Sequence, residues 1–197
     1  MRIRLIGAAA LLLALLAPCA VTAEEVAPTY FGKDVSTAKI GGPLHMTDQN
    51  GRRRSFEDFR GKVVVIFFGY TRCPDVCPTT LSRMAQVMRL LGPDAERTQV
   101  LWVTVDPKRD TQALLHNFIP HFDARFLGLR GTLAQTESLA KSFHVGYQIL
   151  KYQSTFLVDH SPEGYLIDPA GVTRLKLPYD MTAEQIAADV RTILGQQ

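Results

Sequence analysis

The feature that most constrains this chain is an unbroken apolar run at residues 62–69, which leads directly into a pair of cysteines. A run rich in Val, Ile and Phe is typical of a strand that is buried on both faces of a sheet. Cys73 and Cys77 follow, and Pro78 suits the first turn of a helix whose apolar spacing continues to Leu91. The order strand, cysteine pair, helix predicts a fold built around one central buried strand.

The remaining patterns alternate between strands and helices. A second buried strand is expected at 100–105, and Asp110 is a candidate cap for the helix after it. Asn50-Gly51 indicates an N-terminal β-hairpin. Further elements are expected as strands at 126–129, 155–159 and 165–168, the last two flanking a turn at 161–164, and as helices beginning at Thr132 and Thr182. Together these elements predict an α/β fold: a thioredoxin-like sandwich with a central mixed sheet flanked by helices and an N-terminal β-hairpin.

The cysteine pair has three residues between its sulfurs, whereas the redox pairs of thioredoxins have two. Residues four apart on a helical turn share one face, so both sulfurs can point at one ion. A helix N-terminus favours the thiolate, and two thiolates make a soft site that suits Cu(I). A structural disulfide and a redox pair use the same two residues, and the spacing leaves both alternatives open.

Two cysteines do not complete a metal site, and a histidine is the natural further ligand. His160 directly follows an expected strand and opens a turn, which is a common position for functional residues. The sequence therefore makes His160 the first candidate. The other histidines are expected at surfaces or core edges: His45, His116, His121 and His144.

The first residues predict a targeting segment at 1–23. Two arginines precede a short apolar run, and small residues stand where a signal peptidase would cut. An uncleaved anchor and a lipid-modified Cys19 are the alternatives. A linker is expected at 24–38 and a thioredoxin-like copper-binding domain at 39–197. The expected location is periplasmic, either soluble after cleavage or tethered to the inner membrane through the N-terminus.

The charge balance argues against a nucleic-acid partner. The chain carries 22 basic and 19 acidic residues, a formal charge of +3. Cleavage after residue 23 would remove Arg2 and Arg4 and no acid, leaving +1. No long basic run remains to bind phosphates. Export would also place Cys73 and Cys77 in an oxidising compartment.

Four separated segments share the pattern of one known family: residues 69–78, 105–111, 127–132 and 158–171. In this order they resemble the Sco/SenC family of copper-binding proteins, over roughly residues 38–195. The resemblance implies a thioredoxin-like fold and one copper ion held by Cys73, Cys77 and His160. Arg72 departs from the family pattern, in which a histidine is common before the first cysteine. It adds positive charge beside Cys73.

The resemblance also implies a function. It indicates a metallochaperone that binds Cu(I), and also tolerates Cu(II), for the dinuclear copper site of cytochrome c oxidase subunit II. Another copper-site apoprotein or another periplasmic copper chaperone are alternative partners. A thiol-disulfide oxidoreductase that reduces the cysteines of the copper-site precursor is the competing function, with Cys73 and Cys77 as its redox-active pair. The same sulfurs serve both, so the sequence does not separate them.

The sequence leaves two roles open for three residues that follow the second strand. Asp106, Arg109 and Asp110 could lie close to the metal, or they could serve only as turn and cap residues around Pro107. Asp159 could orient His160 through a hydrogen bond, as carboxylates often do for metal-binding histidines. It could equally point away from the site.

Overall fold

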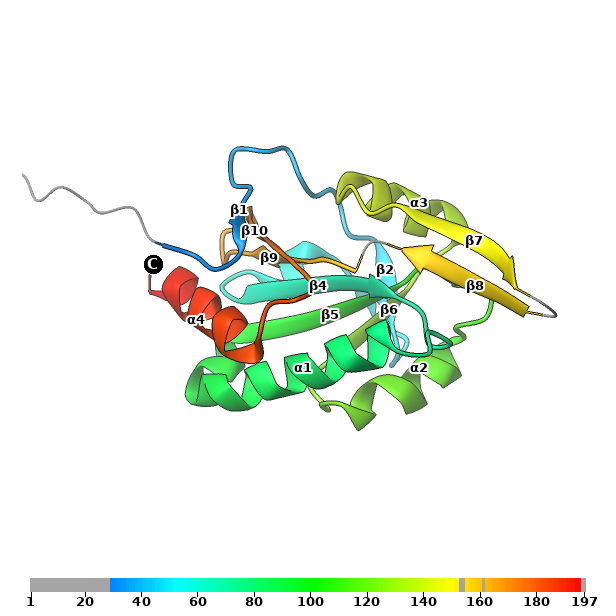
Figure 1. The fold of residues 1–197 in the computed structure, drawn as a ribbon, viewed down its shortest axis with the longest axis horizontal. Helices are drawn as coiled ribbons and strands as arrows, with labels where there is room; N and C mark the ends of the chain where they lie inside the picture. The colour runs from blue at the N-terminus through cyan, green and yellow to red at the C-terminus, as the bar shows by residue number, and fades with distance from the viewer. Residues whose placement is uncertain (1–28, 153–154, 161, 196–197) are drawn as a thin grey trace, which may run out of the picture.

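The computed structural model describes residues 29–152, 155–160 and 162–195, and for 149–152 and 155–160 it describes the backbone alone (Figure 1). Its centre is an eight-stranded sheet in the order β1-β10-β9-β4-β5-β6-β2-β3. The strands are β1 (Lys33–Asp34), β2 (Met46–Asp48), β3 (Arg53–Arg54), β4 (Val63–Gly69), β5 (Thr98–Thr104), β6 (Leu127–Arg130), β9 (Gly164–Ile167) and β10 (Thr173–Leu177).

The central strand β4 explains the mixed character of the sheet. It pairs in parallel with β5, from Val63 opposite Thr98 to Gly69 opposite Thr104. On its other side it pairs antiparallel with β9, and β5 pairs in parallel with β6. The predicted mixed sheet is confirmed. Since parallel strands run in one direction, β4, β5 and β6 all end at the same edge of the sheet.

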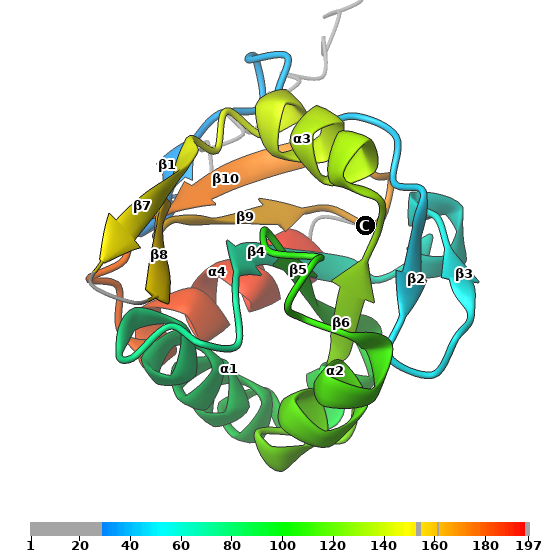
Figure 2. The same cartoon turned by 90° about the vertical axis from the view of Figure 1, so that its right-hand side faces the viewer.

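Helices cover both faces of the sheet, so β4 is apolar along its whole length (Figure 2). Val63, Val65 and Phe67 pack in one core with the helices α1 and α4. Val64, Ile66 and Phe68 point the other way, into a second core with α3. The helices are α1 (Val76–Leu91), α2 (Gln112–Phe118), α3 (Leu133–Ser142) and α4 (Ala183–Leu194), with short 3₁₀ turns η1 (Phe56–Phe59), η2 (Gly92–Arg97) and η3 (Ile119–His121).

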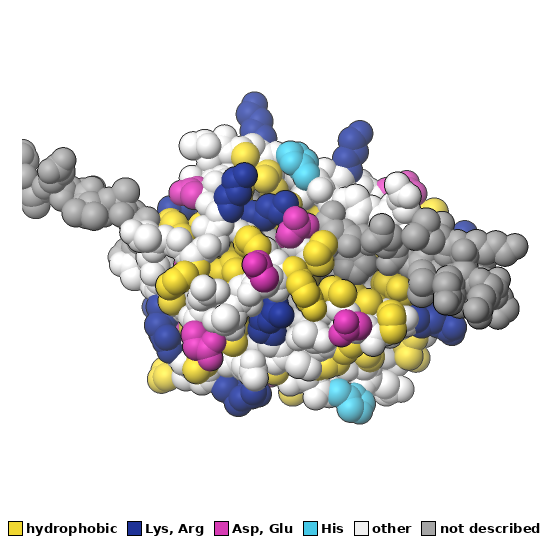
Figure 3. All heavy atoms as spheres, viewed as in Figure 1, with side chains coloured by type: hydrophobic (Ala, Val, Ile, Leu, Met, Phe, Trp, Pro, Cys, Tyr) yellow, Lys and Arg dark blue, Asp and Glu magenta, His cyan; other side chains and the backbone are white. Residues whose placement is uncertain are grey.

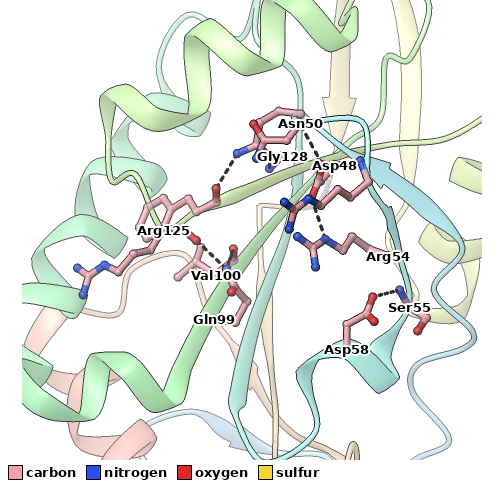
Figure 4. A network of polar contacts seen from close by, with 12 residues as sticks. Asp48, Asn50, Arg54, Ser55, Asp58, Gln99, Val100, Arg125 and Gly128 are labelled. Carbon is pink, nitrogen blue, oxygen red and sulfur yellow. Dashed lines mark hydrogen bonds and ion pairs between the residues drawn. The ribbon is translucent and has the colours of Figure 1, made fainter.

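The predicted N-terminal hairpin is present as β2 and β3. Gly51 has a φ of 82°, a conformation that glycine adopts without strain. The buried carboxylate of Asp48 accepts hydrogen bonds from the backbone of Asn50 and Arg52, and Arg54 forms an ion pair with it at 2.8 Å. Figure 4 shows Asp48 beside Asn50 and Arg54. The carboxylate of Asp48 thus stabilises the turn between β2 and β3.

The sheet begins before residue 39. Part of the segment that the sequence predicts to be a linker forms β1, in which Lys33 lies opposite Lys176 of β10. The predicted targeting segment at 1–23 lies outside the described residues. Within the described part of the chain, no helix is both long and apolar enough to cross a membrane.

One predicted pairing is wrong. The strand expected at 155–159 is β8 (Thr155–His160), but it does not form a hairpin with the strand that follows it. It pairs antiparallel with β7 (Tyr147–Tyr152) in a separate two-stranded sheet. Only Gln153 and Ser154 separate β7 from β8 in the sequence. That dipeptide is not one of the glycine or asparagine pairs that indicate a hairpin, so the sequence pattern did not predict the pairing of β7 with β8.

Candidate metal centre

The two cysteines lie where β4 passes into α1. Cys77 is in the first turn of the helix and is buried, with 3% of its surface exposed. Cys73 lies in the preceding loop and is half-buried, and both are free thiols. The Cys77 N–H donates to the Sγ of Cys73 at 3.4 Å. The sulfurs are therefore not arranged across one helical turn as predicted: the loop folds Cys73 back onto the helix start.

The electrostatics of Cys77 differ from the sequence-based expectation. Burial raises the pKa of its thiol well above the ordinary value, and the neighbouring Cys73 raises it further. A hydrogen bond with the Tyr70 backbone acts in the opposite direction but is weaker. Burial therefore outweighs the stabilisation of a thiolate expected at a helix N-terminus. Without a bound cation, Cys77 is a neutral thiol at neutral pH.

Gly69, the last residue of β4, leaves the space that Cys77 occupies. A Cβ atom at this position would lie 2.9 Å from the Cys77 Sγ and 2.7 Å from the Trp102 Nε1. Both distances are shorter than normal packing permits, so the strand must end in glycine here. Gly69 was not among the candidate site residues that the sequence patterns indicated. A glycine at the end of a strand of bulky residues was the feature that could have indicated it, because such a glycine often marks a close approach by another group.

Asp110 holds the loop that carries Cys73. Its carboxylate is fully buried and accepts hydrogen bonds from the Thr71 backbone N–H at 3.1 Å and the Thr71 hydroxyl at 2.6 Å. The Thr104 hydroxyl donates to the same carboxylate at 2.6 Å. Burial raises the pKa of Asp110, while these hydrogen bonds act against the shift. The carboxylate thereby ties the loop after β4 to the end of β5.

The predicted helix cap at Asp110 is therefore wrong. Thr111 is the N-cap of α2, and its side chain accepts from the Leu114 backbone at 3.2 Å. Asp110 belongs instead to the surroundings of the cysteine loop, which was the other role left open by the sequence.

A second link joins the same two loops. Arg109 forms an ion pair with Asp106. Its guanidinium carbon also lies 5.9 Å from the centre of the Tyr70 ring, a cation–π arrangement. Tyr70 is buried directly after β4. The turn after β5 is thus fixed against the residues that lead into Cys73.

His160 is the last residue of β8, and its backbone lies opposite Tyr147 of β7. Its side chain, like that of Asp159, lies outside the described side chains, so its ligand role stays a prediction. Both views place the β7–β8 pair at the end of the molecule where β4 finishes and α1 begins (Figures 1 and 2). The described side chains contain no group of three or more His, Cys, Asp or Glu residues arranged to hold a metal ion.

The other histidines lie on other segments of the chain. His45 is exposed and lines a cavity of about 630 Å³ with Arg53 and Arg54 beside the N-terminal hairpin. His144 follows α3 with a φ of 54° and lines a cavity of about 650 Å³ next to the start of β7. His116 and His121 lie on α2 and η3.

A mixed sheet with a cysteine pair where its central strand passes into the next helix defines a thioredoxin-like dithiol protein. The family comparison is more specific: the SCO1/SenC model matches residues 32–195, and the chain belongs to that family.

Two curated relatives and one solved structure illustrate the likeness. A Bos taurus mitochondrial SCO2 homolog is 38% identical over 159 residues, which are 78% of this chain and 60% of the relative. A Rickettsia felis SCO2-like protein is 35% identical over 136 residues, 68% of this chain and 66% of the relative. This chain therefore spans less than two thirds of either relative's length. The structure of Bradyrhizobium japonicum ScoI with copper bound has a TM-score of 0.74 and 37% identity, and the match covers 79% of this chain and 99% of that one.

Proposed function

We propose that this protein is a copper metallochaperone that binds one copper ion through Cys73, Cys77 and His160 and delivers it for assembly of the dinuclear copper site of cytochrome c oxidase. The observation that carries the proposal is the hydrogen bond from the Cys77 N–H to the Cys73 Sγ at 3.4 Å. It folds the first sulfur back onto the residue that carries the second. The copper-bound structure of a relative with the same fold supports the choice of metal.

The donor set fits copper chemically. Two sulfurs make a soft site for Cu(I), and an imidazole nitrogen would also let the site accept Cu(II). Because burial raises the pKa of Cys77, copper loading must release the proton of that thiol. The surrounding fold does not depend on the ion, since the cores on both faces of β4 are apolar. The apoprotein should therefore fold without metal.

Copper titration of the reduced protein tests the cysteine ligands. We expect about one Cu(I) per chain from one three-ligand site. Cys73→Ser and Cys77→Ser should each abolish tight binding, because each removes a soft anionic donor. Full copper binding by either variant would overturn the site.

His160→Ala tests the third ligand. Cu(I) accepts low coordination numbers, so its binding should weaken without being lost. Cu(II) binding should suffer more, because that ion depends more on the nitrogen. X-ray absorption would count the nitrogen donors. An unchanged spectrum with unchanged Cu(II) affinity would remove His160 and direct attention to His45 and His144.

A thiol-disulfide oxidoreductase is the second candidate function, and the unequal exposure of the cysteines favours considering it. Cys73 is half-buried, whereas Cys77 is 3% exposed. Cys73 is thus the sulfur that a partner's disulfide can reach. In such an exchange, Cys73 and Cys77 would form a disulfide while the partner's disulfide becomes two thiols. The reduction potential of the pair and the metal content of the purified protein would separate the two functions.

The location and partner belong to the same proposal. We expect residues 1–23 to direct export to the periplasm, with the domain either released or tethered to the inner membrane. The expected partner is cytochrome c oxidase subunit II, with another copper-site apoprotein or another periplasmic copper chaperone as alternatives. Mass spectrometry of the protein recovered from the periplasmic fraction would test export and show whether the segment is cleaved.

A further inference from the structure

The edge of the sheet that carries the cysteine loop has a basic residue at or just after the end of each of its three parallel strands. Arg72 follows β4, Lys108 follows β5, and Arg130 is the last residue of β6. We call Arg72, Lys108 and Arg130 the basic rim. Since β4, β5 and β6 end at the same edge, these residues lie on the side of the molecule that presents Cys73.

The charges of the basic rim are poorly neutralised. Arg72 and Lys108 are exposed and form no ion pair with any described side chain. Arg130 donates from Nε and Nη2 to the Pro107 carbonyl, at 3.1 and 2.9 Å, and not to a carboxylate.

The acids on the same loops do not compensate. Asp106 pairs with Arg109, Asp110 is buried within three hydrogen bonds, and only Asp75 is exposed. Positive charge is therefore in excess beside the half-buried sulfur of Cys73.

The opposite edge of the same three strands differs. At the opposite edge of the parallel strands, Arg125 pairs with Asp123 at 2.6 Å and with Glu96 at 4.0 Å. The face over α1 and α4 carries basic and acidic side chains interspersed with hydrophobic ones (Figure 3). What sets the rim apart is its position, because these cations lie at the edge of the sheet that carries the cysteine loop.

The rim is also held in place before any partner arrives. The Asp110–Thr71 hydrogen bonds fix the Arg72 loop to the turn that follows β5. The Arg130–Pro107 bonds fix the Lys108 loop to β6. The loops that carry these charges therefore lose little backbone freedom on binding, which suits them to steering a charged partner.

We propose that the basic rim docks an acidic protein surface that surrounds the acceptor thiols of the partner, and so guides those thiols to Cys73. The inference rests on the proposed function, because it concerns how copper leaves the site. Cys77 is buried, so a partner must approach on the Cys73 side, where the rim lies. Complementary charge there raises the association rate more than it raises the final affinity.

The test compares two lysine substitutions of equal charge change. Lys108→Glu reverses a charge on the rim, and Lys33→Glu reverses one on β1, where Lys33 is also exposed. Cu(I)-loaded wild type and both variants are mixed with the reduced apo copper domain of cytochrome c oxidase subunit II, and transfer is followed by stopped flow. Transfer to a small uncharged chelator and association of the copper-free proteins with the same domain are measured in parallel.

At low ionic strength, Lys108→Glu should slow transfer to the protein acceptor by about fivefold to tenfold, and about 0.5 M salt should remove most of the difference. Lys33→Glu should match wild type, and all three proteins should deliver copper to the chelator equally fast. Equal rates for the two variants, or a wild-type rate insensitive to salt, would overturn the proposal. The proposal would also be overturned if the wild-type protein bound anionic lipid vesicles but did not bind the acceptor domain. Failure of the wild type to hold copper, with charge-dependent association intact, would instead refute the proposed function.

Discussion

Asp110 and Asp189 are two buried carboxylates at opposite ends of the molecule. Both are held in the interior by the hydrogen bonds that they accept, but they stabilise different parts of the protein. Asp110 lies between β5 and α2, under the cysteine loop, and accepts a hydrogen bond from Thr104 at the end of β5. Asp189 lies on α4, beside β1 and at the other end of the fold (Figure 1). It accepts hydrogen bonds from the Phe31 backbone at 2.9 Å and the Gly32 backbone at 2.8 Å. Burial raises the pKa of both carboxyls, and the hydrogen bonds they accept act against that shift.

The difference between them lies in what donates to each carboxylate. Asp189 accepts only backbone N–H groups, so it fixes the path of the chain into β1 without regard to side chains. Asp110 accepts mainly hydroxyl groups, from Thr71 and Thr104, and thereby orients a loop that carries a candidate ligand. We infer that Asp189 serves the architecture of the domain and Asp110 serves the geometry of the site.

The largest effect on stability is expected for Asp189→Ala. It leaves two backbone N–H groups without an acceptor and removes two charge-assisted hydrogen bonds, a loss of about 3 kcal/mol in the free energy of unfolding. Copper affinity should stay within about twofold of wild type, below the tenfold that 1.4 kcal/mol represents. Urea unfolding and copper titration of the same preparation measure both. A large loss of copper affinity in the folded variant would contradict the inference that Asp189 serves only the architecture of the domain.

Asp110→Asn should act mainly on the site. The amide keeps the shape of the side chain but cannot accept from all three donors. Copper affinity should fall about tenfold, as it does when a partner that orients a metal ligand is lost. Thr71→Ser keeps the hydroxyl and is the matched control, with affinity close to wild type. Unchanged copper affinity and an unchanged dithiol reduction potential in Asp110→Asn would leave Asp110 with a structural role only.

A smaller effect is expected for Thr111→Ala, which separates capping from positioning. Loss of the N-cap of α2 should cost about 1 kcal/mol of stability. Because Thr111 is next to Asp110 but is not part of its hydrogen bonds to the cysteine loop, copper affinity should not change. If Thr111→Ala weakened copper binding as much as Asp110→Asn, the effect of Asp110 would reflect helix stability and not loop geometry.

The smallest expected effect is on the pH dependence of stability, to which Asp189 contributes. Its pKa in the folded protein is raised above the ordinary value of 3.8, so its contribution to stability is fully present below that value. The contribution is lost as pH rises through the folded-state pKa. Wild type should therefore lose stability relative to Asp189→Asn as pH rises above 3.8. Urea midpoints of both proteins across this range measure the difference, and a relative gain for wild type would contradict the direction of the pKa shift.

The sequence by itself determined the elements whose patterns are local. The apolar run at β4 predicted a strand buried on both faces, because a short run rich in Val, Ile and Phe is typical of such a strand. The apolar positions of α1 that the spacing indicated, including Leu81, Met84 and Met88, are all buried. Asn50-Gly51 predicted the turn between β2 and β3. The thioredoxin-like plan followed from the order of these elements.

The tertiary structure decided which distant segments meet. Asp110 was predicted to cap its own helix, but it binds Thr71, 39 residues earlier. Asp189 binds Phe31 across 158 residues, and β8 pairs with β7 instead of the strand that follows it. Periodicity and capping patterns depend on neighbours within a few positions, whereas a buried carboxylate accepts any donor that packing brings to it. For that reason the sequence identified the cysteine loop, and only the fold identified the groups that hold it.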